Sequence, residues 1–107
     1  MDTAFLRRLR FVIEFPFPGP DDRRRIWERV FPEQAEQVAL EYGFLSRLEL
    51  PGGNIRSVAV NAAFLAAAER KPIAMPHVVR AAVREYTKLS KPISAAEFGP
   101  YYGAARP

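Results

Sequence analysis

The sequence contains no cysteine and only one histidine, His77. The missing thiols exclude a disulfide framework, thiolate catalysis and cysteine-ligated metal centres. With a single imidazole in the chain, we expect no histidine-ligated metal site and no histidine-centred catalytic triad. No apolar run approaches the roughly 20 residues of a membrane-spanning helix. The first residues also lack the apolar core of a signal peptide, so we expect a cytoplasmic protein without membrane contact.

What the sequence does contain is an ordinary globular composition in a short chain. Its 107 residues allow one domain of modest size, and 49% hydrophobic against 26% charged residues argues against wholesale disorder. The net charge is +4, and 13 of the 16 basic residues are arginines. Because arginine binds phosphates through paired hydrogen bonds, this charge fits a phosphate-bearing partner, although a solvated basic surface is the simpler explanation.

Ten prolines divide the chain into segments whose patterns predict secondary structure. A short helix is predicted before residue 10, and the β-branched and aromatic residues at 11–15 predict one strand. Apolar residues at helical spacing then predict four helices, at about 20–31, 42–48, 54–70 and 76–89. The predicted fold class is therefore mostly α: a bundle of about four helices preceded by a short helix and one orphan strand.

The orphan strand suggests how the chain is organised. An isolated strand is not stable in water, so residues 1–19 are interpreted as the remnant of a separate core domain. Residues 20–90 are assigned to the helical domain. Residues 91–107 are rich in Pro, Gly and Ala, so we expect a mobile tail, whose aromatic side chains could fold back onto the bundle.

The predicted helix at 54–70 is apolar nearly all round, which places it in the middle of the bundle. Asn54 is its predicted N-cap, because a short polar side chain there can accept a hydrogen bond from the first turn. Gly52 and Gly53 are expected to supply a turn with positive φ and to allow close helix packing.

Several polar residues are expected to lie outside the core. The three arginines at 23–25 are interpreted as a solvated face, and His77 as structural or solvent-exposed. In the predicted last helix, His77, Arg80, Arg84, Glu85 and Lys88 are expected to lie mainly off the apolar face.

Three segments carry a resemblance to a known family. They are residues 2–10 before the predicted strand, the Phe-Pro pair and arginine-rich helix start at 17–27, and Gly-Gly-Asn-Ile-Arg-Ser-Val-Ala-Val-Asn-Ala-Ala at 52–63. In this order and spacing they resemble the C-terminal third of an AAA+ ATPase module. The resemblance covers roughly residues 2–89 and implies the last strand of a nucleotide-binding core followed by a helical lid.

The resemblance implies site residues as well as a fold. Arg7 and Arg8 fall where the family carries its arginine finger, which stabilises charge on the γ-phosphate held by a neighbouring subunit; Arg10 is a third candidate. Arg56 falls at the second sensor, which contacts the phosphates in its own subunit, and Gly52 and Gly53 are grouped with it as nucleotide-binding. For each arginine the alternative interpretation is a solvated side chain.

The implied function is nucleotide sensing and inter-subunit contact within an ATP-driven remodelling ring, a homohexamer in the intact parent, with a protein as a possible substrate. ATP is the implied nucleotide, with Mg²⁺ held by the absent core. This chain itself contains no Gly-x-x-x-x-Gly-Lys-[Ser/Thr] loop and no apolar run that ends in paired acids. We therefore expect the isolated chain to hydrolyse no ATP and to hold no cofactor.

Two other classes of function remain open at this stage. A stand-alone basic helical module could bind nucleic-acid phosphates through the arginines at 23–25 and the basic residues of the last helix. A small adaptor bundle would have no nucleotide role at all. The orphan strand argues against both, and an apolar central helix could not enter a groove, so nucleic acid is not the expected partner.

Overall fold

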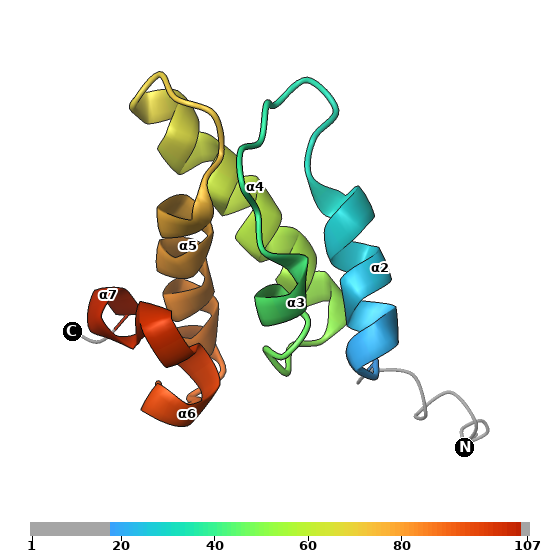
Figure 1. Ribbon diagram of the computed structural model, residues 1–107, viewed down its shortest axis with the longest axis vertical. Helices are drawn as coiled ribbons and strands as arrows, with labels where there is room; N and C mark the ends of the chain where they lie inside the picture. Colours follow the sequence, from blue (N-terminus) through green and yellow to red (C-terminus); the bar gives the residue numbers. More distant parts are fainter. Residues whose placement is uncertain (1–17, 106–107) are drawn as a thin grey trace, which may run out of the picture.

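The apolar periodicity of the sequence is matched by the order of helices in the computed structural model, which describes residues 18–105 (Figure 1). The chain forms α2 (Pro20–Val30), α3 (Tyr42–Leu45), α4 (Gly52–Ala68) and α5 (Met75–Lys88), and then the short turns α6 (Ala95–Phe98), η2 (Gly99–Tyr101) and α7 (Tyr102–Ala105). The prediction of a mostly helical bundle is confirmed. The predicted strand at 11–15 and the helix before it lie outside the described residues.

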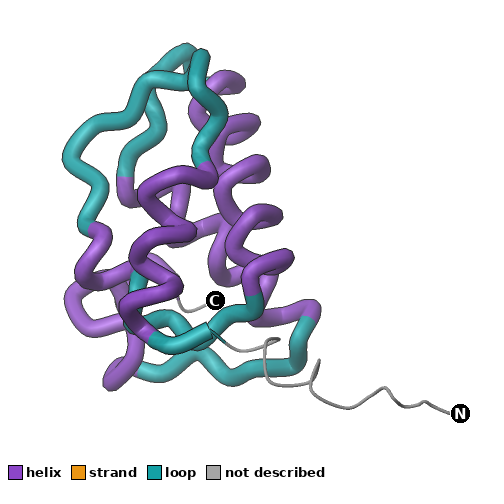
Figure 2. The backbone as a smooth tube through the Cα atoms, turned by 90° about the vertical axis from the view of Figure 1, so that its right-hand side faces the viewer, coloured by secondary structure: helices purple, strands orange, loops and turns teal. Residues whose placement is uncertain are grey.

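Between residues 18 and 105 the structure contains no strand, only an isolated parallel bridge between Gln37 and Ile73. The Val38 amide donates to the Ile73 carbonyl at 2.9 Å, and the Ile73 amide donates to the Glu36 carbonyl at 2.8 Å. These bonds hold the long α2–α3 loop against the segment that leads into α5. In the view turned by 90°, loops gather at both ends of the bundle and along one side (Figure 2).

Helix α2 begins and ends where the sequence predicts. Pro20 suits the first turn because its missing N–H needs no partner there, and Asp21 and Asp22 complement the positive end of the helix. Trp27 and Phe31, one turn apart, are buried, and their ring centroids lie 6.1 Å apart. This face of α2 therefore packs into the core.

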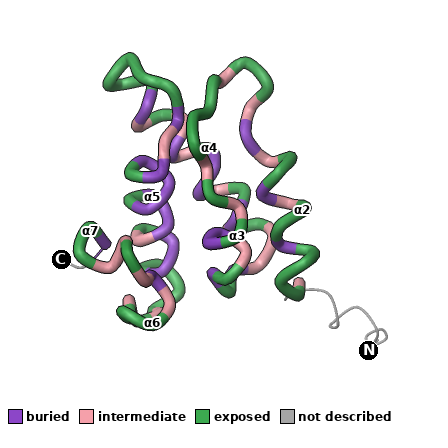
Figure 3. Tube along the Cα trace, viewed as in Figure 1, coloured by how far each residue is buried: buried purple, intermediate pink, exposed green. Residues whose placement is uncertain are grey.

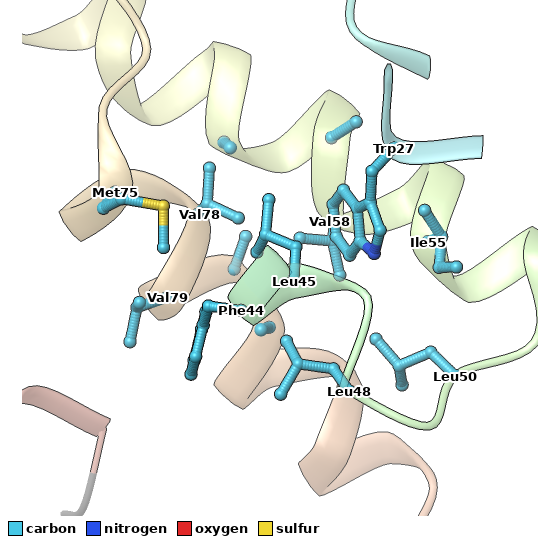
Figure 4. Packing of buried hydrophobic residues seen from close by; sticks show 14 of the residues in the cluster. Trp27, Phe44, Leu45, Leu48, Leu50, Ile55, Val58, Met75, Val78 and Val79 are labelled. Atoms are coloured by element: carbon cyan, nitrogen blue, oxygen red, sulfur yellow. The ribbon is translucent and has the colours of Figure 1, made fainter. Parts of the chain in front are cut away.

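Helix α4 packs against both α5 and α2. Five of its residues are buried: Ile55, Val58, Ala59, Ala62 and Ala66. The core continues through α3 and the segment after it, whose apolar side chains fill the space beside α4 (Figure 4). The helix is thus in the middle of the bundle, as the sequence predicts.

The outward face of α4 differs from the expectation of a helix buried all round. Val60 is 41% exposed and Phe64 is 70% exposed. The reason is that α2 and α5 cover two flanks of α4 and leave the side opposite the core open. Exposed and buried stretches accordingly alternate along α4 (Figure 3).

The segment after Lys91, which the sequence predicts to be a mobile tail, forms α6, η2 and α7 against the bundle. Phe98 is fully buried, with its ring 5.2 Å from that of Tyr86 in an edge-on arrangement. The Tyr101 hydroxyl donates to the Glu41 carboxylate at 2.5 Å, and this bond raises the pKa of Tyr101 to about 12. The aromatic side chains have folded back, and Phe98 anchors the segment.

We predict that Phe98→Ala destabilises the chain by about 3–5 kcal/mol, because it leaves a cavity between α5 and α6. Val38→Ala, at a residue that is 49% exposed, should change the free energy of unfolding by less than about 0.5 kcal/mol. Urea denaturation of both variants measures the difference. If Phe98→Ala were as mild as the control, the C-terminal segment would not belong to the folded unit.

Candidate functional site

The residues that the resemblance assigns to nucleotide contact lie at the start of α4, where Gly52 and Gly53 open the helix and Arg56 begins its second turn. Pro51 caps the helix with extended backbone, at φ −62° and ψ 157°, and Gly52 and Gly53 are already helical. In the described part of the chain, the glycine with positive φ is Gly99. The expected positive-φ turn at Gly52 and Gly53 is therefore wrong, because Pro51 makes the bend before the helix begins.

Close packing does not require these glycines either. A Cβ atom at Gly52 would lie 3.8 Å from Cδ1 of Ile26, an ordinary contact, and one at Gly53 would meet nothing within 4 Å. What the two residues do provide is polar backbone. The amides of Asn54 and Ile55 both donate to the Pro51 carbonyl at 3.0 Å, whereas those of Gly52 and Gly53 have no acceptor among residues 18–105.

Asn54 does not cap α4, contrary to the sequence prediction, because the helix begins two residues earlier and includes it. Its Nδ2 atom instead donates to Oε1 of Glu85 on α5 at 2.8 Å. Nζ of Lys88 donates to the other oxygen, Oε2, at 3.0 Å. Asn54, which the sequence predicts as a cap, thus joins the start of α4 to α5.

The burial of Glu85, the carboxylate that Asn54 and Lys88 contact, differs from the sequence prediction. Glu85 is 1% exposed, although the sequence places it off the apolar face of α5. Burying a carboxylate is costly unless it is hydrogen-bonded and paired, and Asn54 and Lys88 meet both needs. The carboxylate also places negative charge beside the first turn of α4, where the helix dipole favours it.

Arg56 begins the second turn of α4 and lies on a different flank of the helix. It is exposed, and it has no ion-pair or hydrogen-bond partner in the part of the chain that the structure describes. At 100° per residue, Arg56 shares a face with Val60 and Phe64, one and two turns along, and lies about 200° from Asn54. The guanidinium is therefore directed away from Glu85, on the face that the bundle leaves open.

Of the predicted site residues, the structure brings together Arg56, Gly52 and Gly53. Arg7 and Arg8, with Arg10, lie outside the described residues. The structure therefore does not describe how these arginines lie relative to α4, and their assignment remains a prediction.

The arginines at 23–25 do not form one solvated face. Arg23 is 8% exposed; its Nε donates to the Ser46 carbonyl and its Nη1 to the Pro18 carbonyl, both at 2.7 Å. Arg24 and Arg25 are exposed, as expected, and pair with acids on α2 itself. Arg23 is thus a structural residue, because its long side chain joins the Ser46 carbonyl at the end of α3 to the Pro18 carbonyl just before α2.

His77 has the structural role that was one of its two expected interpretations, and it is 4% exposed. The Ala74 amide donates to its Nδ1 at 3.0 Å, so Nδ1 carries no proton. Nε2 then carries the proton and donates to Oε1 of Glu69 at 2.8 Å. This arrangement supplies half of a capping box at the start of α5, with histidine in the place that Glu or Gln usually takes.

The described residues include no group of acidic or histidine side chains that could hold a metal ion. Among the helices between residues 18 and 105, none is both long enough and apolar enough to cross a membrane.

Comparison with known proteins gave no match, whether to a protein-family model, to a curated protein or to a solved structure.

His77→Ala should destabilise the chain by about 1–2 kcal/mol, because the N-terminus of α5 loses its acceptor and Glu69 loses its donor. His77→Gln should cost clearly less, since its side-chain oxygen can accept the same backbone amide. Thermal unfolding of the two variants provides the comparison. Equal losses would mean that the site needs the volume of the imidazole rather than its hydrogen bond.

Glu69 gives a prediction about pH. The hydrogen bond from His77, supported by the nearby charges of Lys71 and Arg80, lowers the pKa of Glu69 below its usual 4.5. A lowered folded-state pKa means that the carboxylate stabilises the fold above pH 4.5, and that this contribution is lost as the pH falls through the folded-state value.

The stability difference between the wild type and Glu69→Gln should therefore shrink as the pH falls from 5 through 4.5 and below. Urea denaturation across this range measures it. Glu33→Gln, at an exposed residue with no ion pair among residues 18–105, is the control and should show no such trend. A Glu69 difference that does not change with pH would contradict the assignment.

Proposed function

We propose that this chain is the lid segment of an AAA+ ATPase and contributes nucleotide sensing and inter-subunit contacts to an ATP-hydrolysing ring. The observation that carries this proposal is the position of Arg56. It is exposed, has no ion-pair partner among residues 18–105, and begins the second turn of α4 on the face that the bundle leaves open. A second sensor needs such an arginine, free to reach a phosphate outside its own bundle.

The backbone at the start of α4 supports a phosphate at this end, beside the flank that the Glu85 carboxylate already occupies. The helix dipole is positive at the start of α4, and Arg56, which begins the second turn, adds positive charge near that end, which is unfavourable. A bound phosphate would offset this cost, and the free amides of Gly52 and Gly53 are groups that bind anions at helix starts. The residues present therefore fit a nucleotide phosphate, although they do not form a complete nucleotide site.

The rest of the catalytic apparatus would come from elsewhere in the ring. Phosphoryl transfer depends on a phosphate-binding loop and on Mg²⁺ ligands, and the sequence contains neither motif. ATP and Mg²⁺ would be held by a core domain. In this arrangement Arg56 acts within its own subunit, whereas Arg7 and Arg8 extend toward the neighbouring one.

The division of roles can be tested in an intact ring whose subunits contain this segment. Arg7→Ala or Arg8→Ala should lower ATP turnover by about 10³–10⁵-fold with ATP binding nearly intact, which is the range measured for arginine fingers. Arg56→Ala should instead change the subunit's own response to nucleotide. Each mutant is mixed with subunits whose own nucleotide site is disabled, and ATP turnover is measured.

The finger mutants should regain activity in the mixture, because the disabled neighbour still supplies an intact finger. The Arg56 mutant should not, because its defect lies in its own site. Arg25→Ala, another exposed arginine, is the matched control and should leave turnover unchanged. Equal rescue of finger and Arg56 mutants, or rescue of neither, would contradict the assignment.

A further inference from the structure

A hollow of about 200 Å³ lies between α5 and the C-terminal turn α7. These two elements pack side by side at one edge of the bundle (Figure 1). The hollow combines two basic side chains with four apolar ones, and it is lined by Leu65, Arg80, Val83, Arg84, Ala104 and Ala105. A basic rim over an apolar wall is the kind of surface that binds a small molecule with a charged group and a hydrocarbon part.

The apolar wall of this hollow is made of small and medium side chains. Ala104 and Ala105 of α7 leave the space that larger side chains would fill, and Val83 of α5 and Leu65 of α4 complete the wall. Pockets for drug-sized ligands have volumes of about 300–1,000 Å³. This hollow is smaller, so it has room for a small molecule and not for a nucleotide.

The two arginines lie one turn apart on α5 and line the same hollow. Like charges at this spacing repel each other, so a bound anion between them would be favourable. Nη1 of Arg80 lies 3.6 Å from Oε2 of Glu69, whose other oxygen accepts a hydrogen bond from His77. Arg84 is exposed and has no ion-pair or hydrogen-bond partner among residues 18–105. The charge of Arg84 is therefore left uncompensated at the hollow.

We propose that this hollow binds a small organic carboxylate, whose oxygens contact Arg84 and Arg80 and whose hydrocarbon part packs on Val83 and Leu65. A guanidinium matches a carboxylate because its N–H groups can donate two parallel hydrogen bonds to the two oxygens. A ligand with one negative charge matches the one uncompensated arginine. The apolar wall favours a hydrocarbon part over a fully hydrated inorganic anion.

This proposal does not depend on the proposed function. Leu65, which lines the hollow, lies about 180° around α4 from Arg56 at 100° per residue. The carboxylate site and the face that holds Arg56 are therefore on opposite flanks of α4, and each can be tested without the other.

Butyrate is a suitable probe, because it combines one carboxylate with a short hydrocarbon chain. Followed through the backbone amide signals in NMR, it should bind saturably, with the largest shifts in α5 and α7. Butyramide, its neutral isostere, should bind at least about 10-fold more weakly, because it has no charge for the arginines to pair with. Inorganic phosphate, which is charged but has no hydrocarbon part, should also bind more weakly than butyrate.

Arg84→Gln should weaken butyrate binding by about 10–100-fold, the range expected for loss of a hydrogen bond to a charged group. Arg24→Gln, at an exposed arginine of α2 that does not line the hollow, is the matched control and should bind as the wild type does. Ala104→Leu should abolish binding because the larger side chain fills the hollow, whereas Ala96→Leu, at another exposed alanine, should not. Circular dichroism would show that all four variants are folded.

Absence of saturable butyrate binding by the folded wild type at tens of millimolar would overturn the proposal. Equal affinities for butyrate and butyramide would also overturn it, as would an Arg84→Gln variant that binds as tightly as the wild type. Tighter binding of phosphate than of butyrate would mean that the hollow holds an inorganic anion, and the assignment to a carboxylate would be wrong. None of these results would change the outcome expected for Arg56 in the ring.

Discussion

The packing of α4 against α5 is the contact on which the rest of the structure depends. Small side chains on both helices, among them Ala59, Ala62 and Ala82, are buried in one cluster, and they allow the two backbones to approach closely. The hydrogen bond between Asn54 and Glu85 fixes one end of this pair, and His77 fixes the start of α5 at the other. Helices α2 and α3 and the C-terminal turns pack onto this frame.

Polar groups set the register of α4 on α5, because a buried polar group without a hydrogen-bond partner destabilises the fold. An apolar helix can slide or rotate against its partner at little cost, but a buried carboxylate that loses its donor is penalised by several kcal/mol. Glu85 therefore selects one arrangement of α4 on α5. Arg23 does the same for α2, since its two bonds to backbone carbonyls require α3 to lie where it does.

Much of the fold could be predicted from the sequence, because proline and apolar spacing report local structure directly. The four main helices follow from these signals, but the burial of Glu85, His77 and Arg23 does not. Each of these polar residues has a partner at least eight positions away, as His77 has in Glu69, and no local pattern reveals such a pairing. A periodicity signal was present for Glu85, which lies one and two turns after Ala81 and His77, both buried. The prediction of a mobile tail is wrong for a similar reason. Its composition is typical of a mobile segment, but the one buried ring of Phe98 holds it on the bundle.

The candidate site, like the fold, could be predicted from the sequence only in part. Sequence could identify Arg56 and the glycines before it, but the open face behind them appears only once α2 and α5 are seen to cover two flanks of α4. A helix that is apolar nearly all round must be enclosed on every side or must meet another molecule, because water solvates its outer face poorly. The described bundle encloses α4 incompletely. If the proposed function holds, a nucleotide-binding core would cover this face, and Arg56 at its edge would be available to the nucleotide held there.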